Sequence, residues 1–344
     1  MTRFVQLHLL VSYPPANLNR DDLGQPKTAR MGGVDRLRIS SQSLKRAWRT
    51  SDLMQQQIGE RIGKRTKRLG CEAFDALVAA GIPEKSAKEW ATKIAGVYGA
   101  VKKENPLEIE QLVHVAPEER ATLDALVATL AAEKRAPTED ELDALLHTQT
   151  AVDIAMFGRM LASKTEHNAE AAVQVAHAIG VHASVIEDDY FTAVDDLNLA
   201  DPGAAHIGET GFAAAVFYQY VCIDRDLLKR NLGGDEALTQ RALRAVAEAA
   251  HKVGPTGKQN SFASRAYAHY SLIEKGSQQP RSLSLAFVKP VSGSDYAGEA
   301  VQSLERVREN MDKVYGNCAD ARYELDVLKG KGSLAELLDF VAVE

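Results

Sequence analysis

NLNRDDLGQPKTARMGGVDRLRISSQSLKRAWR, residues 17–49, is the segment that decides the fold. It leads from a predicted strand, through a loop that contains the pair Gly32-Gly33, into a predicted helix. Residues 20–49 carry eight Lys and Arg against three Asp, a net charge of +5, whereas the whole chain has a net charge of −6. A cation cluster that opposes the charge of the chain indicates an anionic partner bound at one place.

The end of this segment predicts a helix that presents its N-terminus and its cations to the same side. Leu37 and Ile39 form a short strand, and Ser40 or Ser41 can cap the helix, because a hydroxyl accepts hydrogen bonds from its first N–H groups. One face is apolar, and the opposite face carries Gln42, Lys45, Arg46 and Arg49. A helix N-terminus beside Lys and Arg suits phosphate. The alternative is an ordinary amphipathic helix with a solvated basic face.

The charge of the whole chain is distributed unevenly. Residues 1–68 contain 14 Lys and Arg against 5 Asp and Glu, a net charge of +9. Residues 69–344 contain 27 against 42, a net charge of −15. A length of 344 residues with 45% hydrophobic content is enough for one large domain or two ordinary ones. A basic N-terminal quarter on an acidic remainder fits an anion groove in a soluble body.

Cysteines and hydropathy indicate a cytoplasmic protein. Cys71, Cys222 and Cys318 form no C-x-x-C motif and have no nearby pair of histidines, so neither a disulfide framework nor a zinc site is expected. The N-terminal apolar run is too short for a signal peptide or a membrane span, and no later segment reaches 18 apolar residues. We therefore expect no membrane partner.

The order of sequence patterns predicts an α+β fold. Residues 4–12 alternate as a strand with a more polar, open face containing Gln6 and His8, and residues 52–150 carry helical patterns, with a capping box at Thr138. Further strands are expected at 152–160, 212–223, 267–273 and 283–288, and further helices at 169–179, 235–252, 299–315 and 333–341. Residues 188–211 predict a long hairpin. This order allows a ferredoxin-like, RNA-recognition-motif core, although the aromatic RNP1 pattern is absent.

The sequence contains no recognisable catalytic motif. GPTGKQNS, residues 254–261, lacks the spacing of a P-loop, and no G-x-S-x-G or H-E-x-x-H motif occurs. Asp21-Asp22 and Asp195-Asp196 could bind a metal, but such pairs are more typical of turns and caps. The residues thus favour binding over catalysis, with no metal and no cofactor.

Several ordered motifs carry a resemblance to a known family. They are NLNRDD, the glycine pair and RISSQSLKRAWR, then VDIAMFGRM, VAHAI, FTAVDDL, AHIG, the strand around VFYQY, and finally GKQNSFA. They run from the first strand to about Phe262. This set resembles the CasC family, the repeated crRNA-binding backbone subunits of the type I-E CRISPR surveillance complex, Cascade.

The resemblance implies a fold like a hand. Its palm is a modified RNA-recognition motif, expected at residues 1–58 and 212–344. A mainly helical fingers lobe is expected at 59–187, with a return strand near 152–160, and a hairpin thumb at 188–211. Such subunits polymerise head-to-tail along one CRISPR RNA (crRNA), hold its sugar–phosphate backbone and present its bases. The implied partners are crRNA, copies of the chain, other Cascade subunits, and target DNA through the guide.

The resemblance also implies which residues contact RNA. The matching backbone contacts are Lys27, Ser40, Gln42, Lys45, Arg46 and Arg49; Arg20 is added because it shares their basic cluster. Met160 matches a residue that wedges beside bases, although a lone Met is more often core filler. Lys258 and Gln259 lie in a loop expected to contact RNA or a neighbouring copy, rather than an ordinary polar loop.

Three further residues match the thumb, which folds over the RNA and displaces a base at regular intervals. They are Tyr190, Phe191 and Val194. The family usually has Trp where Tyr190 stands, so the wedge here has a smaller flat ring. The alternative is that Phe191 and Val194 simply anchor a hairpin.

Two other classes of function are open to test. Backbone subunits of related type III complexes cleave RNA with an acidic loop residue, and Asp21, Asp22 and Asp35 lie in the corresponding basic loop. The type I-E motifs argue against this endonuclease, because that branch leaves DNA cutting to a separate nuclease-helicase. A transcription factor using the 41–49 helix would need a helix-turn-helix partner upstream, where a Gly-Gly loop and a strand stand instead.

Overall fold

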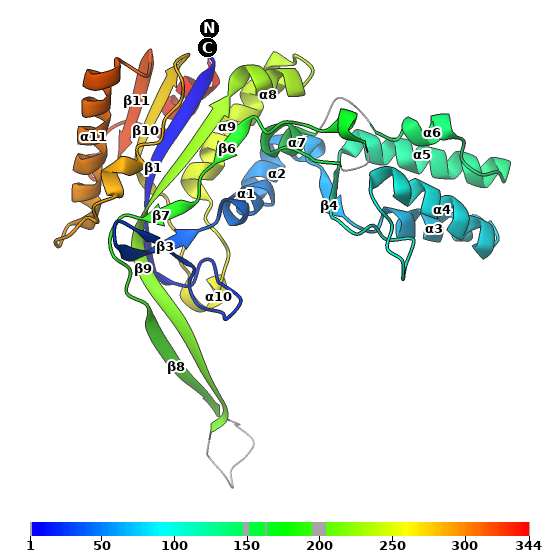
Figure 1. Cartoon of the computed structure of the whole chain (residues 1–344), viewed down its shortest axis with the longest axis horizontal. Helices are drawn as coiled ribbons and strands as arrows, with labels where there is room; N and C mark the ends of the chain where they lie inside the picture. The colour runs from blue at the N-terminus through cyan, green and yellow to red at the C-terminus, as the bar shows by residue number, and fades with distance from the viewer. Residues whose placement is uncertain (1, 147–150, 162–163, 195–203, 344) are drawn as a thin grey trace. The chain divides into compact units, whose positions relative to one another are not determined.

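The computed structural model describes residues 2–146, 151–161, 164–194 and 204–343 (Figure 1). The chain groups into two units by its internal contacts. The first, here the sheet unit, contains residues 1–54, 174–224 and 243–344. The second, here the helical unit, contains residues 55–173 and 225–242. The division predicted from the sequence has other boundaries: it put 55–58 and 225–242 in the palm, 174–187 in the helical lobe, and 188–211 in a separate thumb.

The sheet unit is built around β1 (Phe4–Ala16), which pairs antiparallel with two strands. The sheet runs in the order β11-β10-β1-β9-β7-β3-β2, with β6 and β8 also paired to β9 (Figure 1). The bounds of these strands are β2 Thr28–Met31, β3 Val34–Ile39, β6 Val173–Val175, β7 Ala178–Gly180, β8 Glu187–Val194, β9 Ala204–Asp224, β10 Ala268–Gly276 and β11 Ala321–Asp326. The α+β class predicted from the sequence is confirmed.

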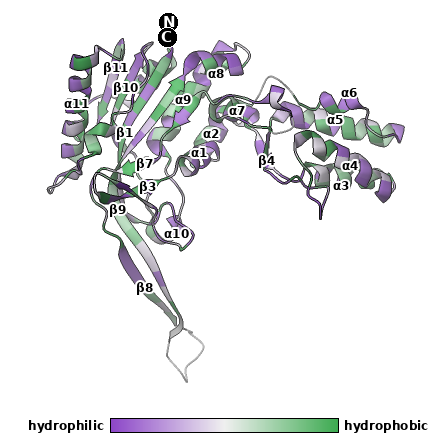
Figure 2. Cartoon of the chain, in the orientation of Figure 1, coloured by the Kyte–Doolittle hydropathy of each residue, from purple (hydrophilic) through white to green (hydrophobic). Residues whose placement is uncertain are grey.

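Helices cover both faces of this sheet. One face packs on α11 (Tyr296–Tyr315) and η3 (Ser284–Phe287), through a core that includes Leu10, Tyr218 and Leu304. The opposite face of β1, with Val5, Leu7 and Leu9, lies on the side of α1 (Ser41–Arg49), α9 (Glu236–Lys252) and α12 (Leu334–Ala342). Hydrophobic and hydrophilic residues alternate around α11, as amphipathic packing requires (Figure 2).

The polar face of β1 is closed, contrary to its sequence prediction. Gln6 and His8 are both buried, because α11 and the loop before it cover that face. The His8 ring hydrogen-bonds to the hydroxyl of Tyr218 at 2.9 Å and lies 3.3 Å from a carboxylate oxygen of Glu274. A buried polar network of this kind is maintained only when its members satisfy one another.

The helical unit has its own apolar core. It is formed mainly by α3 (Leu69–Ala79), α4 (Glu84–Tyr98) and α5 (Pro117–Glu133), with Leu77, Ile94 and Leu123 at its centre. The remaining elements are α2 Asp52–Ile58, η1 Gly59–Arg61, β4 Lys64–Thr66, β5 Val113–Val115, α6 Glu139–Asp143, α7 Val152–Phe157, η2 Thr165–His167 and α8 Arg225–Asn231. The capping box predicted at Thr138 is confirmed, since its hydroxyl accepts from the N–H of Glu141.

Three predicted elements are wrong. The expected return strand near 152–160 is helix α7, whose six residues are all buried, so no periodic exposure distinguishes helix from strand. The expected helix at 169–179 instead contributes β6 and β7, because pairing with β9 outweighs the helix propensity of its alanines. The expected strand at 283–288 contains η3, which packs under α11.

A long hairpin leaves the sheet. Strand β8 pairs antiparallel with the first part of the 21-residue strand β9, from Glu187↔Phe212 to Val194↔Ala204 (Figure 1). This pairing spans the described part of the predicted thumb. Residues 195–203, including the Asp195-Asp196 pair, lie outside the described residues. In the part of the chain that the structure describes, no helix combines the length and hydrophobicity needed to cross a bilayer.

Candidate nucleic-acid interface

The N-terminus of α1 is built by the segment that precedes it. Ser40 has extended backbone angles and caps the helix, as predicted, by accepting a hydrogen bond from the N–H of Ser43 at 3.3 Å. The N–H of Ser40 donates to the Asn19 side chain at 2.8 Å. Leu44 and Trp48 are buried, and the indole of Trp48 donates to the carbonyl of Val253. These contacts turn the other side of α1 outward.

Of the four contacts predicted on α1, three lie on its exposed or partly exposed side. Gln42 and Arg46 are exposed and Lys45 is partly exposed. Arg49 is only 8% exposed, so the prediction that it shares the open cationic face is wrong. A helical wheel treats α1 as an isolated helix, whereas in the structure α2 begins only three residues after Arg49.

A polar cavity of about 440 Å³ lies beside this helix. Arg20 and Arg46 line it together with Ser43, Thr50 and the backbone of Pro255–Gly257. Its ionisable lining therefore consists of these two arginines and Asp21. Arg20, which the sequence analysis adds to the basic cluster, thus lines the same cavity as Arg46 of α1.

A second group of cations meets at His177. The guanidinium of Arg38 (β3) lies 3.0 Å from His177 Nδ1. Burial lowers the pKa of His177, and the charges of Arg38, Lys27 and Lys45 lower it further. Cations from the N-terminal loop, β3 and α1 thus converge on one surface of the sheet unit. We call Arg20, Lys27, Arg38, Lys45 and Arg46 the cation cluster.

One cation of the same segment is structural. Arg36 is fully buried and donates to the carbonyls of Gly180 and Phe287 at 2.9 and 3.0 Å. Burial lowers its pKa. Its neighbour Gly32 has a φ of 63°, and a side chain there would collide with the carbonyl of Val288. The count of cations in residues 20–49 therefore overstates the charge available to a ligand.

The loop containing Lys258 and Gln259 closes the site on another side. Lys258 has a left-handed φ of 50° and precedes α10 (Gln259–Phe262), and the ring of Phe262 lies 5.9 Å from that of Phe212 at the hairpin base. The side-chain nitrogen of Gln259 is buried with no hydrogen-bond partner among the described residues. An unpaired buried donor suits a site that is completed by a ligand.

The base of the hairpin is tied to the N-terminal loop. The side-chain amide of Asn17 donates to the carbonyls of Gly24 and Gly211 at 2.9 and 2.8 Å. A Cβ at Gly211 would stand 1.8 Å from the side-chain oxygen of Gln25, so a larger residue there would have to displace the Gln25 side chain. Figure 1 shows the N-terminal loop, α10 and the base of β8 and β9 gathered near α1.

The thumb residues do not all face one way. Tyr190 is 65% exposed and pairs with Glu209, whereas Phe191 is 41% exposed and pairs with Gly208. Successive residues of a strand point to opposite faces, so the two rings lie on opposite sides of the hairpin. Val194 pairs with Ala204 at a register shift, and its side chain lies outside the described residues.

Met160, in the helical unit, is 81% exposed and therefore does not fill a core. Arg159, just before it, is buried and forms a 2.7 Å ion pair with Glu119, which fixes the backbone from which Met160 projects. The position leaves an apolar side chain open to a partner.

One acid of the loop, Asp21, has a structural use. One carboxylate oxygen of Asp21 accepts from the N–H groups of both Leu23 and Gln25 at 2.9 Å, the pattern of a turn. Across the described residues, no group of three or more His, Cys, Asp or Glu is arranged to hold a metal ion.

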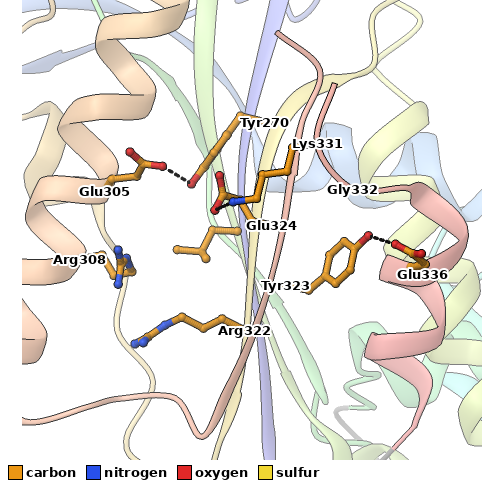
Figure 3. Close-up of a pocket in the computed structure, with 10 residues that line it drawn as sticks. Tyr270, Glu305, Arg308, Arg322, Tyr323, Glu324, Lys331, Gly332 and Glu336 are labelled. Carbon is orange, nitrogen blue, oxygen red and sulfur yellow. Dashed lines mark hydrogen bonds and ion pairs between the residues drawn. The ribbon is translucent and has the colours of Figure 1, made fainter. Parts of the chain in front are cut away.

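The sheet unit contains another pocket, beside β10, β11 and α11, with a volume of about 460 Å³ (Figure 3). It is lined by three glutamates and by Arg308, Arg322 and Lys331. Its polar groups pair with one another, as in Lys331–Glu324 and Tyr323–Glu336. Equal numbers of both charges give it no preference for a polyanion, unlike the cation cluster.

Comparisons with known proteins show the family of this chain. The family model described as "CT1975-like protein" matches residues 5–336. A chain of a solved "CRISPR RNA-guided surveillance complex, pre-nicking" is 29% identical, with 98% of this chain and 99% of that chain covered and a TM-score of 0.84. A chain of a "CRISPR RNA-guided surveillance complex" is 27% identical over 98% of both chains, with a TM-score of 0.63. No curated protein matches.

Proposed function

Because the chain belongs to the family of CT1975-like proteins, we propose that it is a crRNA-binding subunit of a CRISPR surveillance complex. More specifically, it is the repeated backbone subunit of a type I-E complex. Copies polymerise head-to-tail along one crRNA, hold its sugar–phosphate backbone and leave its bases free to pair with target DNA. The matched chains of surveillance complexes are covered almost from end to end, which supports a subunit of the same kind.

The observation that carries this proposal is the cation cluster on and beside α1, a helix whose N-terminus is capped. Two of its five cations belong to α1 and three come from the N-terminal loop and β3, while Ser40 caps the first N–H groups of the helix. Such groups bind phosphates through charge and hydrogen bonds and carry no sequence information. One protein can then hold any guide, while base pairing reads the target.

The hairpin and Met160 supply the apolar part of the proposed role. Tyr190 and Phe191 stand exposed on the two faces of a strand, and Met160 is exposed on the helical unit. We expect the hairpin to close over RNA, where apolar side chains offset the few kcal/mol needed to unstack a base. Contacts between unlike surfaces of identical subunits would extend such an assembly into an open filament.

Catalysis is not part of the proposed role. Asp21, the first acid of the loop, already accepts two backbone hydrogen bonds, and the described carboxylates form no metal-binding group. We expect the pure protein with Mg²⁺ to leave RNA and DNA intact. Cleavage exceeding one turnover, abolished by Asp22→Ala or Asp35→Ala, would instead establish the endonuclease function.

Co-purification tests the proposed function. The chain would be expressed with a CRISPR array and the other subunits of a type I-E complex, and the nucleic acid bound to it would be sequenced. We expect RNA of defined length from the array, whatever the spacer. Recovery of no RNA, or of unrelated cellular RNA in place of the array transcript, would contradict the proposal.

A further inference from the structure

His177 stands among the cations of the proposed RNA site, yet no function has been assigned to it above. The N–H of Ala176, just before it, donates to the carbonyl of Tyr220 at 3.0 Å. Directly after it, Ala178 pairs with Ile39 of β3. The backbone is thus held on both sides, while the imidazole remains exposed. An exposed side chain on a fixed backbone is well placed to meet a ligand.

The contact with Arg38 determines which ring nitrogen of His177 carries a proton. A guanidinium has only donors, so the 3.0 Å contact requires Nδ1 of His177 to accept from Arg38. Nδ1 is then unprotonated, and the neutral ring carries its single proton on Nε2. Arg38 is itself oriented by a hydrogen bond from its Nε to the carbonyl of Thr28. Nε2–H is therefore the donor that His177 can offer to another group.

Among the described residues, the charged groups that shift the pKa of His177 are all cations. They are Arg38 from β3, Lys27 from the N-terminal loop and Lys45 from α1, and together with burial they lower the pKa of His177. On the β9 side, the ring of Tyr220 stacks on His8 and not on His177. A phosphate bound among these cations would reverse the sign of the local field. Protonation of the imidazole, now unfavourable, would become favourable.

We propose that His177 is a proton-linked member of the RNA-backbone site, neutral and bonded to Arg38 in the free chain and protonated when a phosphate is bound. Protonation of Nδ1 ends its role as an acceptor and releases Arg38 toward the same phosphate. Binding of the RNA backbone therefore takes up a proton. This inference rests on the proposed function, because it assumes that the cation cluster holds RNA.

The sign and size of the effect follow from linkage. The bound state holds His177 more strongly protonated than the free state, so RNA affinity rises as pH falls from about 8 to about 6. If phosphate raises the pKa of His177 by one unit, the affinity increases by up to about tenfold. The added charge also makes binding more sensitive to salt at low pH. For a single strand, the slope of log affinity against log salt concentration becomes steeper by about 0.7.

The test uses the full chain and a single-stranded RNA, with calorimetric titration in buffers of different ionisation enthalpy. The heat measured in each buffer gives the number of protons taken up per RNA site. Two variants act on His177: His177→Gln removes the titration, and His177→Lys supplies a charge that does not depend on pH. The matched control is His182→Gln, since His182 stacks on Tyr296 at 4.2 Å and not on the cation cluster.

We expect the wild-type chain and His182→Gln to take up a fraction of a proton per site near pH 6. His177→Gln should lose that uptake, and His177→Lys should bind as tightly at pH 8 as at pH 6. Equal proton uptake in wild type and His177→Gln, with RNA binding intact, would overturn this inference alone. Failure of the wild-type chain to bind RNA at any pH would overturn the proposed function as well.

Discussion

Removing two exposed cations from α1 should weaken RNA binding without regard to RNA sequence. The double substitution Lys45→Ala with Arg46→Ala takes away one cation that acts on His177 and one that lines the cavity beside Arg20. Both side chains project from a helix whose packing depends on Leu44 and Trp48, which stay in place. Folding should therefore be unaffected.

The size of this effect can be worked out from the two contacts. An exposed charge pair contributes up to about 1 kcal/mol, so the loss should be about 1–2 kcal/mol, or roughly a fivefold to thirtyfold weaker affinity. Each phosphate contact with a single strand contributes about 0.7 to the slope of log affinity against log salt. The slope should then fall by about 1.4.

The assay is fluorescence anisotropy with three RNAs of unrelated sequence, at several salt concentrations. The matched control is Arg306→Ala with Lys313→Ala, which removes two exposed cations from α11 on the other face of the sheet. We expect the α1 variant to lose affinity equally for all three RNAs and the control to lose little. Losses that follow RNA sequence, or equal losses in both variants, would refute the account of α1 as a backbone-binding helix.

Three further predictions concern the hairpin and the core. Phe191→Ala should preserve folding and most RNA affinity but impair target pairing in the assembled complex, whereas an unchanged yield of paired target would argue that the ring only anchors the hairpin. Arg36→Met should lower the free energy of unfolding by about 2–4 kcal/mol, because two buried carbonyls lose their hydrogen-bond donor. Arg38→Met should leave the free energy of unfolding unchanged and reduce RNA affinity. A stable Arg36→Met together with a destabilised Arg38→Met would contradict the structural role of Arg36 and the binding role of Arg38. Burial opposes ionisation of Glu274, but hydrogen bonds from His8 and Arg281 outweigh burial and lower the pKa of Glu274. The carboxylate therefore stabilises the fold above about pH 4.3, and this stabilisation is lost as the pH falls below that value. The free energy of unfolding of Glu274→Gln should fall less steeply with acid than that of the wild type, and an equally steep fall would exclude Glu274 as the source.

The parts of the site that follow from local chemistry could be predicted from the sequence. Ser40 caps α1 because a hydroxyl before an amphipathic run satisfies free N–H groups, and Leu44 and Trp48 are buried because of their helical spacing. The pairing of β8 with β9 follows from two extended runs that flank residues 195–203 in the sequence. These signals involve residues close together in the chain.

Features that depend on distant segments could not be predicted in this way. In the sequence Arg36 only adds to the positive charge of residues 20–49, and its structural role depends on the carbonyls of residues 180 and 287. The alanines of 169–179 favour a helix until β9 supplies a partner for pairing. His177 lies in the quoted motif VAHAI, but Arg38 meets it from 139 positions away, a contact that no local pattern encodes.

A footprint of the bound guide tests the central claim most directly. RNA held by the assembled chain would be probed in parallel with a reagent that ethylates phosphates and with reagents that modify the pairing edges of bases. We predict that the phosphates are protected while most pairing edges stay reactive, whatever the guide sequence. Protected base edges above freely ethylated phosphates would contradict the account, since the chain would then be reading bases and not holding the backbone.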